Sequence, residues 1–315
     1  MFWIGSKSII DNTFTFGTLL SFNALLIYFT DPLFRLINIQ PKIQEALVSA
    51  ERVNEIFENE PEQNEEYIFL KPKSINGDIE FKDVSFRYGT RAEIFKDLSF
   101  HIKKGQCVGF VGPSGCGKTT MLKLLLKYYI PDSGKIYIDN NDLNDIDNEI
   151  LRNHIGYVPQ DIFIFSGTVA ENIALHKPDA DLKEIIDVAK KSYCNSFIEN
   201  MPEKYNTKLN ERGTILSGGE KQRLAIARAL LIDPDIIIFD EATSNLDNIN
   251  EMMIQEILEK LRGVVTIIII THRLTTIINC DNIFVMDNGK IIDQGKHCEL
   301  LQKDGLYKKL SGSEI

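Results

Sequence analysis

The sequence predicts an α/β fold with a mostly parallel central sheet, preceded by a long apolar helix. Three observations support this prediction. Short apolar runs, among them "CVGFVG", "HIGYVP", "DIIIFD", "VVTIIIITH" and "DNIFVMD", alternate with longer helical stretches, as they do in strand-helix-strand units. The glycine-rich segment "GPSGCGKTT" follows the first of these runs. Residues 12–30 form an uncharged, mostly apolar stretch near the N-terminus.

Length and composition limit the classes of protein that fit this chain. Its 315 residues accommodate one α/β domain and leave about 60 to 80 residues for an appendage. A net charge of -10 provides no general basic surface for nucleic acid, so an anionic ligand must be bound by local groups. The cysteines are odd in number and form no CxxC pair, which argues against a disulfide framework and a zinc site and favours a reducing, cytosolic setting. They are Cys107, Cys116, Cys194, Cys280 and Cys298.

Residues 12–30 are predicted to cross a membrane as a helix, because about 20 mostly apolar residues span the bilayer core. A secretory signal is a weaker interpretation, since no small-residue cleavage site follows and the chain continues as more helix. A buried helix of a soluble domain is the other alternative. One span cannot enclose a pathway, so partner helices are implied. Polar side chains in the span are expected to face other helices or a polar cavity, and they are Thr13, Thr15, Thr18, Ser21 and Asn23.

The segment that follows this span is predicted to extend the helix into the cytosol. Apolar residues recur there at helical spacing as far as Phe57, with a bend expected at Pro41. The acidic segment around Pro61 lacks this periodicity and is predicted to be a linker. Beyond it, "DIEFKDVSFRY" alternates like a half-buried strand. The predicted parts are a membrane helix with its extension over residues 1–59, a linker over 60–76 and the α/β domain over 77–315.

The segment "GPSGCGKTT" is predicted to be a phosphate-binding loop between a strand and a helix. Its glycines let the backbone curl around phosphate oxygens, its lysine neutralises the β and γ groups, and the next hydroxyl is offered to Mg²⁺. Cys116 is expected to be a small space-filling residue rather than a nucleophile, although a helix N-terminus favours thiolate. The loop residues expected to contact nucleotide are Gly112, Pro113, Ser114, Gly115, Cys116, Gly117, Lys118, Thr119 and Thr120.

Asp240 and Glu241 follow four apolar residues and are predicted to lie at the end of a buried strand. A phosphate-binding loop needs a carboxylate there to hold Mg²⁺, a role assigned to Asp240, and Glu241 is then placed to orient or deprotonate the attacking water. A surface acidic pair is the alternative that the apolar run disfavours. His272 and Gln160 each end another strand-like run, and each on its own fits either a capping role or a site role.

Together, the motifs from about Gly77 to the C-terminus resemble the nucleotide-binding domain of ATP-binding-cassette (ABC) transporters. "GPSGCGKTT" resembles the Walker A loop, "IIIFDE" the Walker B strand with its catalytic glutamate, and "SNLD", residues 244–247, the D-loop. "LSGGE" resembles the family signature, which is far more specific than the phosphate-binding loop. Three single residues complete the pattern: Tyr88 resembles the aromatic that stacks on adenine, Gln160 the Q-loop glutamine and His272 the switch histidine.

This resemblance implies a P-loop ATPase fold with an antiparallel β subdomain and an α-helical signature subdomain, and it implies ATP and Mg²⁺ as ligands. In the family two cassettes pair head to tail, so the signature of one copy is expected at the γ-phosphate held by the other. The implied catalytic residues are Glu241, His272, Gln160 and Lys118. The implied metal ligands are Thr119, Gln160 and Asp240. The implied nucleotide contacts outside the phosphate-binding loop are Tyr88, Ser217, Gly218, Gly219 and Asp247.

The N-terminal portion and "ERG", residues 211–213, resemble exporters, in particular the peptidase-containing bacteriocin or double-glycine-leader type. "DIFIFSGTVAENIAL" resembles the segment that meets the coupling helices of the membrane domain. The resemblance implies ATP hydrolysis that powers peptide export, at the cytoplasmic membrane and with the ATPase domain in the cytoplasm. The implied partners are a second copy of the chain, the remaining membrane helices, a peptide cargo and the membrane; no nucleic acid is expected.

The chain departs from the family pattern at several points. Glu220 stands where many members have glutamine, a change not expected to disable the site. Asn245 stands where exporters often have a small residue, which puts communication between sites in doubt. One membrane helix and no cysteine-protease domain are visible, so a fragment, a truncated reading frame and a separately encoded piece are all open.

Two alternative functions are weighed against export. A soluble chromosome- or repair-associated ATPase is disfavoured, because only 99 positions separate Lys118 from Ser217 and leave no room for long coiled coils. A truncated or soluble ABC ATPase, which binds and hydrolyses ATP without forming a transport pathway, stays open, since an intact site does not guarantee an intact machine.

Overall fold

The computed structural model describes residues 2–58, 61–63, 67–211, 213–242 and 248–312. The chain divides into two compact units, residues 1–67 and residues 68–315. The described part of the first unit is helical, and the second unit contains the sheets that the sequence predicts.

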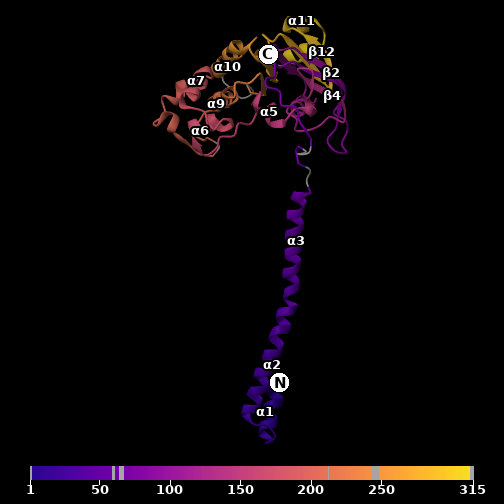
Figure 1. Cartoon of the computed structure of the whole chain (residues 1–315), viewed down its shortest axis with the longest axis vertical. Coiled ribbons are helices and arrows are strands. Elements are labelled where there is room, and N and C mark those ends of the chain that lie inside the picture. The colour runs from indigo at the N-terminus through magenta and orange to yellow at the C-terminus, as the bar shows by residue number, and fades with distance from the viewer. Residues whose placement is uncertain (1, 59–60, 64–66, 212, 243–247, 313–315) are drawn as a thin grey trace. The chain divides into compact units, whose positions relative to one another are not determined.

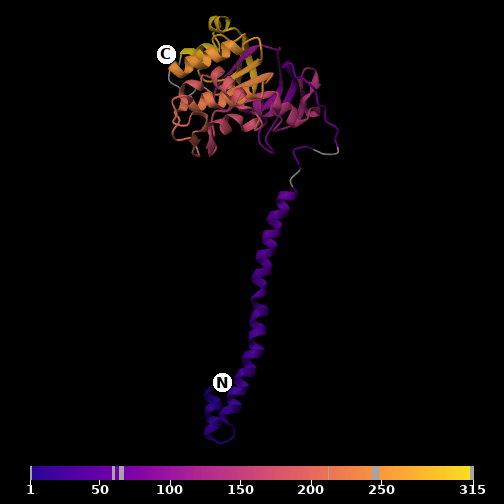
Figure 2. The same cartoon turned by 60° about the vertical axis from the view of Figure 1, so that its left-hand side comes forward.

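Three helices form the described part of the first unit: α1 (Phe2–Ile10), α2 (Phe16–Ile37) and α3 (Ile39–Phe57). α1 packs against α2 so closely that a Cβ on Gly5 would lie 2.3 Å from the Leu19 side chain. α2 and α3 follow one another nearly end to end (Figure 1, Figure 2). Within the part of the chain that the structure describes, Phe16–Phe57 is the one helical stretch long and apolar enough to cross a membrane.

The apolar helix begins later than residue 12, where the sequence predicts the span to start. Asn12 has a left-handed backbone with φ 58°, and Thr15 caps α2 by accepting a hydrogen bond from the Thr18 N–H at 3.2 Å. The helical stretch is interrupted close to Pro41, where a bend is expected. The two helices meet at Asn38, and Pro41 lies in the first turn of α3, where a missing N–H costs no helical hydrogen bond.

A six-stranded sheet with five parallel strands forms the centre of the second unit. Its order is β12-β11-β3-β10-β9-β6, and β12 pairs antiparallel with β11. Strands β3, β9 and β10 are buried along their whole lengths, which explains why they read as continuous apolar runs. The bounds are β3 (Cys107–Val111), β6 (Ile155–Val158), β9 (Ile236–Asp240), β10 (Thr266–Ile270), β11 (Asn282–Asp287) and β12 (Lys290–Gly295).

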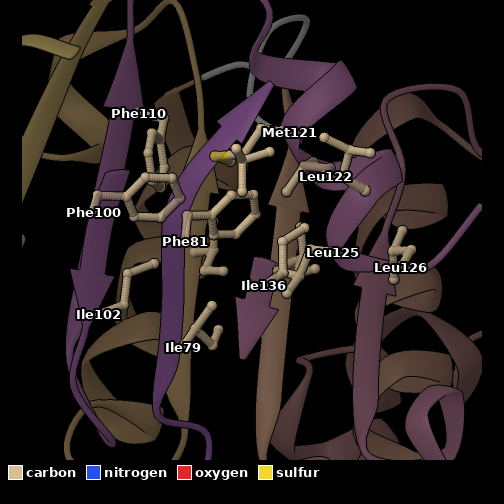
Figure 3. Close-up of a cluster of buried hydrophobic side chains, with 14 of the residues drawn as sticks. Ile79, Phe81, Phe100, Ile102, Phe110, Met121, Leu122, Leu125, Leu126 and Ile136 are labelled. Carbon is tan, nitrogen blue, oxygen red and sulfur yellow. The ribbon is translucent and has the colours of Figure 1, made fainter. Parts of the chain in front are cut away.

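A second, antiparallel sheet has the order β2-β1-β4-β5. Its Phe81 and Phe100 rings stack with centroids 4.4 Å apart, and Phe100 meets Phe110 of the parallel sheet at 5.4 Å. Met121 and Leu125, from the helix after the phosphate-binding loop, belong to the same buried cluster (Figure 3). This core therefore fixes that helix between the two sheets. The bounds are β1 (Ile79–Phe86), β2 (Phe95–Ile102), β4 (Ser133–Ile138) and β5 (Asn141–Asp142).

Helices cover the parallel sheet and also form a helical subdomain of their own. Residues of α6, α7 and α9 enclose a separate buried cluster that includes Ile173, Val188 and Leu224. In Figure 1 these helices lie at the opposite end of the unit from β2 and β4. The α-helices are α4 (Lys118–Leu125), α5 (Asn148–Asn153), α6 (Val169–Ile173), α7 (Leu182–Lys191), α8 (Asn195–Ile198), α9 (Gly218–Leu231), α10 (Asn248–Leu261), α11 (His297–Gln302) and α12 (Leu306–Gly312).

Short elements complete the second unit. β7 (Gly167–Thr168) pairs antiparallel with β8 (Lys208–Leu209) in the helical subdomain. Single 3-10 turns cover Leu143–Asp145, Ala174–His176, Lys204–Asn206 and Leu274–Thr276. The predicted fold class is confirmed: a mostly parallel sheet, an antiparallel β subdomain and a helical subdomain are all present, with a long apolar helix ahead of them.

Thr266 ties the start of the second unit to its central sheet. Its hydroxyl donates to the Gly77 carbonyl at 2.8 Å and accepts from the Gly105 N–H at 2.9 Å. The Thr266 side chain and Gly77 are buried, and Gly105 is partly buried, so water has little access to replace these bonds.

The change Thr266→Val tests this tether. Valine keeps the side-chain shape but leaves the buried Gly77 carbonyl and the partly buried Gly105 N–H unpaired, at about 1 to 3 kcal/mol for a buried group. We expect a loss of about 2 to 5 kcal/mol in the free energy of unfolding, measured by urea denaturation followed by circular dichroism. Ile268→Val, which removes one buried methylene, is the control and should cost about 1 kcal/mol. Equal losses in the two variants would contradict the tether.

Candidate functional site

The predicted phosphate-binding loop joins the end of β3 to the start of α4. Two of its glycines are sterically required. Gly112 has φ 157°, and a Cβ there would lie 2.1 Å from the Met286 carbonyl oxygen; Gly117, with φ 111°, is the N-cap of α4, and its Cβ would lie 2.6 Å from the Phe95 ring. The loop therefore passes closer to β11 and β2 than any side chain allows. It leaves the N-terminal amides of α4 facing the loop, as an anion site requires.

Lys118 is buried inside this loop, with 5% of its surface exposed. Its ammonium donates to the Gly112 carbonyl at 2.8 Å and the Pro113 carbonyl at 3.0 Å, and it lies 3.7 Å from the Cys116 sulfur. Cys116 is itself buried and fills space against Gly112. A fixed cation among exposed loop backbone is suited to bind phosphate. The exposed loop residues are Pro113, Ser114, Gly115 and Thr119.

Tyr88 lies next to this helix, as a base-stacking residue must. Its hydroxyl donates to Thr120 Oγ1 at 3.3 Å. Phe86 and Tyr129 contact the ring edge-to-face, at centroid distances of 4.9 and 5.0 Å, and the Lys123 ammonium lies 5.9 Å from the ring centroid. These contacts hold the ring in one orientation beside α4.

Asp240 is the last residue of β9 and is buried, with 5% of its surface exposed. Tyr157, on the neighbouring strand β6, donates its hydroxyl to Asp240 Oδ2 at 3.1 Å. Burial raises the pKa of Asp240, and the adjacent Glu241 carboxylate adds to that shift, whereas the Tyr157 hydrogen bond and the charge of Lys118 oppose it. The carboxyl group is thus poised to gain from a bound cation.

The Glu241 carboxylate contacts two side chains, each from the loop that follows a neighbouring strand. Its backbone is left-handed (φ 50°), and its N–H donates to the Ile270 carbonyl of β10 at 2.8 Å. Gln160 donates through Nε2 to Glu241 Oε2 at 2.9 Å, and His272 Nε2 lies 2.8 Å from Glu241 Oε1. The three residues predicted from separate strand ends are therefore in direct contact.

Ser217 is the N-cap of α9. Its hydroxyl accepts from the Glu220 N–H at 3.3 Å, while the Glu220 carboxylate accepts from the Ser217 N–H and hydroxyl, both at 2.8 Å. Glu220 therefore completes a capping box, a role that glutamine performs equally. Gly218 has open space where a Cβ would be, whereas a Cβ on Gly219 would lie 2.3 Å from the Asn250 side chain. Because Gly218 has no side chain, the first turn of α9 is open at this residue.

Two predicted segments fall outside the described residues. The D-loop, including Asn245 and Asp247, lies there, and so does residue 212 of "ERG". No geometry is assigned to them.

Sequence analysis missed two polar residues that shape the site. Tyr157 lies in a segment already singled out, but its bond to Asp240 joins positions 83 apart and has no local signal. Arg228 in α9 donates to the Asn172 carbonyl and side chain at 2.6 and 2.7 Å and to the Phe163 carbonyl at 2.6 Å. Burial lowers the pKa of Arg228 to about 10. Arg228 thereby fixes the segment after Gln160 to the signature helix.

Known proteins give the same assignment as the motifs. Residues 95–244 match the family described as ABC transporter. The chain is 43% identical over 311 residues to the lactococcin-G-processing and transport ATP-binding protein LagD of Lactococcus lactis subsp. lactis, covering 98% of this chain and 44% of the relative. It is also 43% identical to the pediocin PA-1 transport/processing ATP-binding protein PedD of Pediococcus acidilactici, over 98% of this chain and 43% of that protein.

A solved structure extends the likeness to three dimensions. The structure of a bacterial Atm1-family ABC exporter with ATP bound matches with a TM-score of 0.80 and 36% identity, over 96% of this chain and 53% of that chain. The chain spans less than half the length of the two curated relatives. The resemblance to ABC exporters of the bacteriocin type is thereby confirmed.

The change Tyr157→Phe tests the charge balance at Asp240. Because the lost hydrogen bond favours the carboxylate, the pKa of Asp240 should rise further. If Asp240 is a ligand of Mg²⁺ as the sequence predicts, it binds the ion in its ionised form, and the Mg²⁺ concentration for half-maximal ATP hydrolysis should increase as the pH falls, beginning at a higher pH than in the unmodified chain. Above that range the two proteins should have equal Mg²⁺ requirements.

Titrations of activity with Mg²⁺ at a series of pH values provide the measurement. Tyr137→Phe, on the antiparallel sheet, is the control and should leave the profile unchanged. An acid limb that stays in place or moves to lower pH in Tyr157→Phe would contradict the assignment.

Proposed function

The chain carries the ATP-binding domain of the ABC transporter family, and from that premise we propose that it is the motor end of an ATP-driven peptide exporter. A domain of this family hydrolyses ATP to ADP and phosphate, so the ATPase prediction is confirmed for the domain. The observation that carries the proposed mechanism is the contact of Gln160 and His272 with the Glu241 carboxylate. The residue roles, the dimer, the cargo and the membrane setting belong to the proposal.

Nucleotide would bind along the loop and the first turn of α4. Lys118 neutralises charge on the β and γ groups, and the loop N–H groups donate to phosphate oxygens. Tyr88 stacks on the adenine, and its fixed orientation supports that role. When nucleotide binds, the Lys118 ammonium would exchange its bonds to the loop carbonyls for bonds to phosphate oxygens.

Mg²⁺ fits the oxygen donors available beside the loop. Thr119 offers an exposed hydroxyl, Asp240 a buried carboxylate and Gln160 a side-chain amide oxygen, which are the ligand types that hard cations prefer. When bound, the ion draws charge from the β and γ phosphate oxygens. Burial raises the pKa of Asp240, and the positive charge of the ion would lower it again.

Glu241 orients the attacking water and accepts its proton as the water oxygen bonds to the γ-phosphorus and the bond to the β-phosphate oxygen breaks. His272 and Gln160 hold the carboxylate at the ends of three adjacent strands. Both residues are exposed, so nothing in the part of the chain that the structure describes covers them on the side where nucleotide would bind.

A second copy of the chain would complete the site. At the N-terminus of α9, Ser217 and Gly218 are exposed and Gly218 has open space beside it, features that suit the γ-phosphate of a partner. In this arrangement Ser217 and Gly219 of one copy face Lys118 of the other, and Asp247 of the D-loop lies at the shared boundary. A symmetric dimer contains two such sites. Contact from both sides holds the dimer closed until hydrolysis removes the γ-phosphate.

Export is supported by the first unit and by one apolar cavity. Phe16–Phe57 provides one membrane helix of the exporter, and further membrane helices would complete the pathway. The cavity, of about 350 Å³, is lined by Phe163, Phe165 and Leu175, whose side chains are exposed. It lies in the segment expected to receive coupling helices. A peptide cargo of the bacteriocin type, at the cytoplasmic membrane with the ATPase in the cytoplasm, follows from the names of the relatives.

Hydrolysis is tested by Glu241→Gln and Lys118→Ala. Loss of the general base should lower kcat about 100- to 10,000-fold without weakening ATP binding, whereas loss of the ammonium should weaken ATP binding itself. Phosphate release and binding of a fluorescent ATP analogue measure the two effects. Glu80→Gln, an exposed change on β1, is the control. Unchanged turnover in both site variants would refute the role assignment.

The shared site is tested by mixing two inactive chains. Ser217→Arg blocks the signature and Lys118→Ala the loop, so each homodimer lacks working sites. A mixed dimer would contain one site with an intact loop from the first chain and an intact signature from the second. We expect ATPase activity to reappear on mixing and to approach about a quarter of the unmodified rate, because half of the dimers are mixed and each has one of two sites. No recovery at any mixing ratio would argue against the head-to-tail dimer.

A further inference from the structure

A short segment just after the boundary between the two units is bound to the nucleotide-binding unit through its backbone. The Leu70 N–H donates to the Asp145 carbonyl at 2.7 Å, and the Asp147 N–H donates to the Leu70 carbonyl at 2.9 Å. Leu70 and Ile146 thus form an isolated parallel bridge. We call residues 69–71 the strap. It lies within the predicted linker region, residues 60–76.

Lys127 contacts both the strap and the loop with which the strap pairs. Its side chain is buried, with 8% of its surface exposed. The ammonium donates to the Asn144 carbonyl at 2.9 Å and the Ile146 carbonyl at 2.6 Å, and it lies 4.9 Å from the centroid of the Phe69 ring. One cation therefore contacts both the strap and the loop with which the strap pairs. Because two carbonyls and an aromatic face surround it, its removal should loosen both.

The position of Lys127 in the chain connects it to the phosphate-binding loop. It comes just after Leu126, the C-cap of α4, and its N–H donates to the Leu124 carbonyl at 3.0 Å. α4 begins at Lys118 and is less than three turns long, so Lys118 and Lys127 lie at opposite ends of one short, buried helix. A displacement of α4 at its phosphate end must reach its strap end.

The loop on the other side of the strap leads to Gln160. Asp147 caps α5 by accepting from the N–H groups of Glu149 and Ile150, at 3.0 and 3.2 Å. α5 runs into β6, which ends two residues before Gln160. The strap therefore contacts two parts of the unit. One is Lys127, after the C-terminal end of α4, whose N-terminal end carries Lys118. The other is the loop before α5, from which the chain runs through β6 to Gln160.

We propose that the strap links ATP binding at the phosphate-binding loop to the chain segment that enters the helical unit, with Lys127 as the positioning residue that fastens it. This inference rests on the proposed ATP site. It gives each copy a route within one chain from its own nucleotide to its own membrane helix, in addition to any contact at the apolar cavity. Linkage is reciprocal. If ATP tightens the strap by some factor, release of the strap must weaken ATP binding by the same factor.

The experiment measures both sides of this linkage on the full chain in detergent, with Mg²⁺ and the non-hydrolysable analogue AMP-PNP. Hydrogen exchange of the Asp147 amide reports opening of the strap, since that N–H is bonded to Leu70. In the unmodified chain AMP-PNP should slow this exchange at least about fivefold. Lys127→Met and Leu70→Pro should each speed exchange in the absence of nucleotide and raise the Kd for AMP-PNP by the factor seen in the unmodified chain.

Two matched variants separate the strap from general damage. Leu70→Ala keeps the N–H bond to the Asp145 carbonyl that Leu70→Pro removes, and Lys73→Met removes an exposed lysine outside the strap. Both should resemble the unmodified chain in exchange and in Kd. Circular dichroism confirms folding of each protein.

The contrary results are distinct. Normal Asp147 exchange in Lys127→Met would show that Lys127 does not fasten the strap. Fast exchange with an unchanged Kd in both strap variants would show that the strap is not linked to the nucleotide. An unmodified chain that fails to bind AMP-PNP would instead overturn the proposed ATP site.

Discussion

The candidate site depends on one constraint, the parallel pairing of β9 with β10 in register to their last residues. Asp240 lies opposite Ile270, and the next residue, Glu241, donates its N–H to the Ile270 carbonyl. Because parallel strands end at the same edge, the side chains that follow them meet there. Glu241 has a left-handed backbone with φ 50°. Two adjacent carboxylates thus receive different surroundings, one tied to Tyr157 and one to Gln160 and His272.

Through Gln160 and His272, the position of the Glu241 carboxylate depends on segments from several parts of the second unit. His272 follows β10, and Gln160 precedes a segment that Arg228 fixes to the signature helix. A shift of the helical subdomain therefore acts on Gln160, and through it on Glu241. The strap provides a comparable route on the side of α4 and β6.

Local patterns in the sequence were sufficient for much of this account. The apolar runs predicted β3, β9 and β10 because these strands are buried on both faces, and the glycine spacing predicted the loop before Lys118. Tertiary contacts had no such signal. The Tyr157 bond to Asp240 and the Lys127 bonds to the 143–147 loop depend on how distant segments pack. The start of α2 was misplaced, since hydropathy does not reveal that Thr15 caps the helix.

The central claim is that one nucleotide is held between two copies of this chain, each contributing a different half of the pocket. The direct measurement is the mass of Glu241→Gln chains in detergent, determined by sedimentation or light scattering with Mg-ATP, with Mg-ADP and without nucleotide. Because this variant retains the γ-phosphate, the account predicts dimers with Mg-ATP and monomers in the other two conditions. Chains that stay monomeric with saturating Mg-ATP, or that form dimers equally well with Mg-ADP, would contradict it.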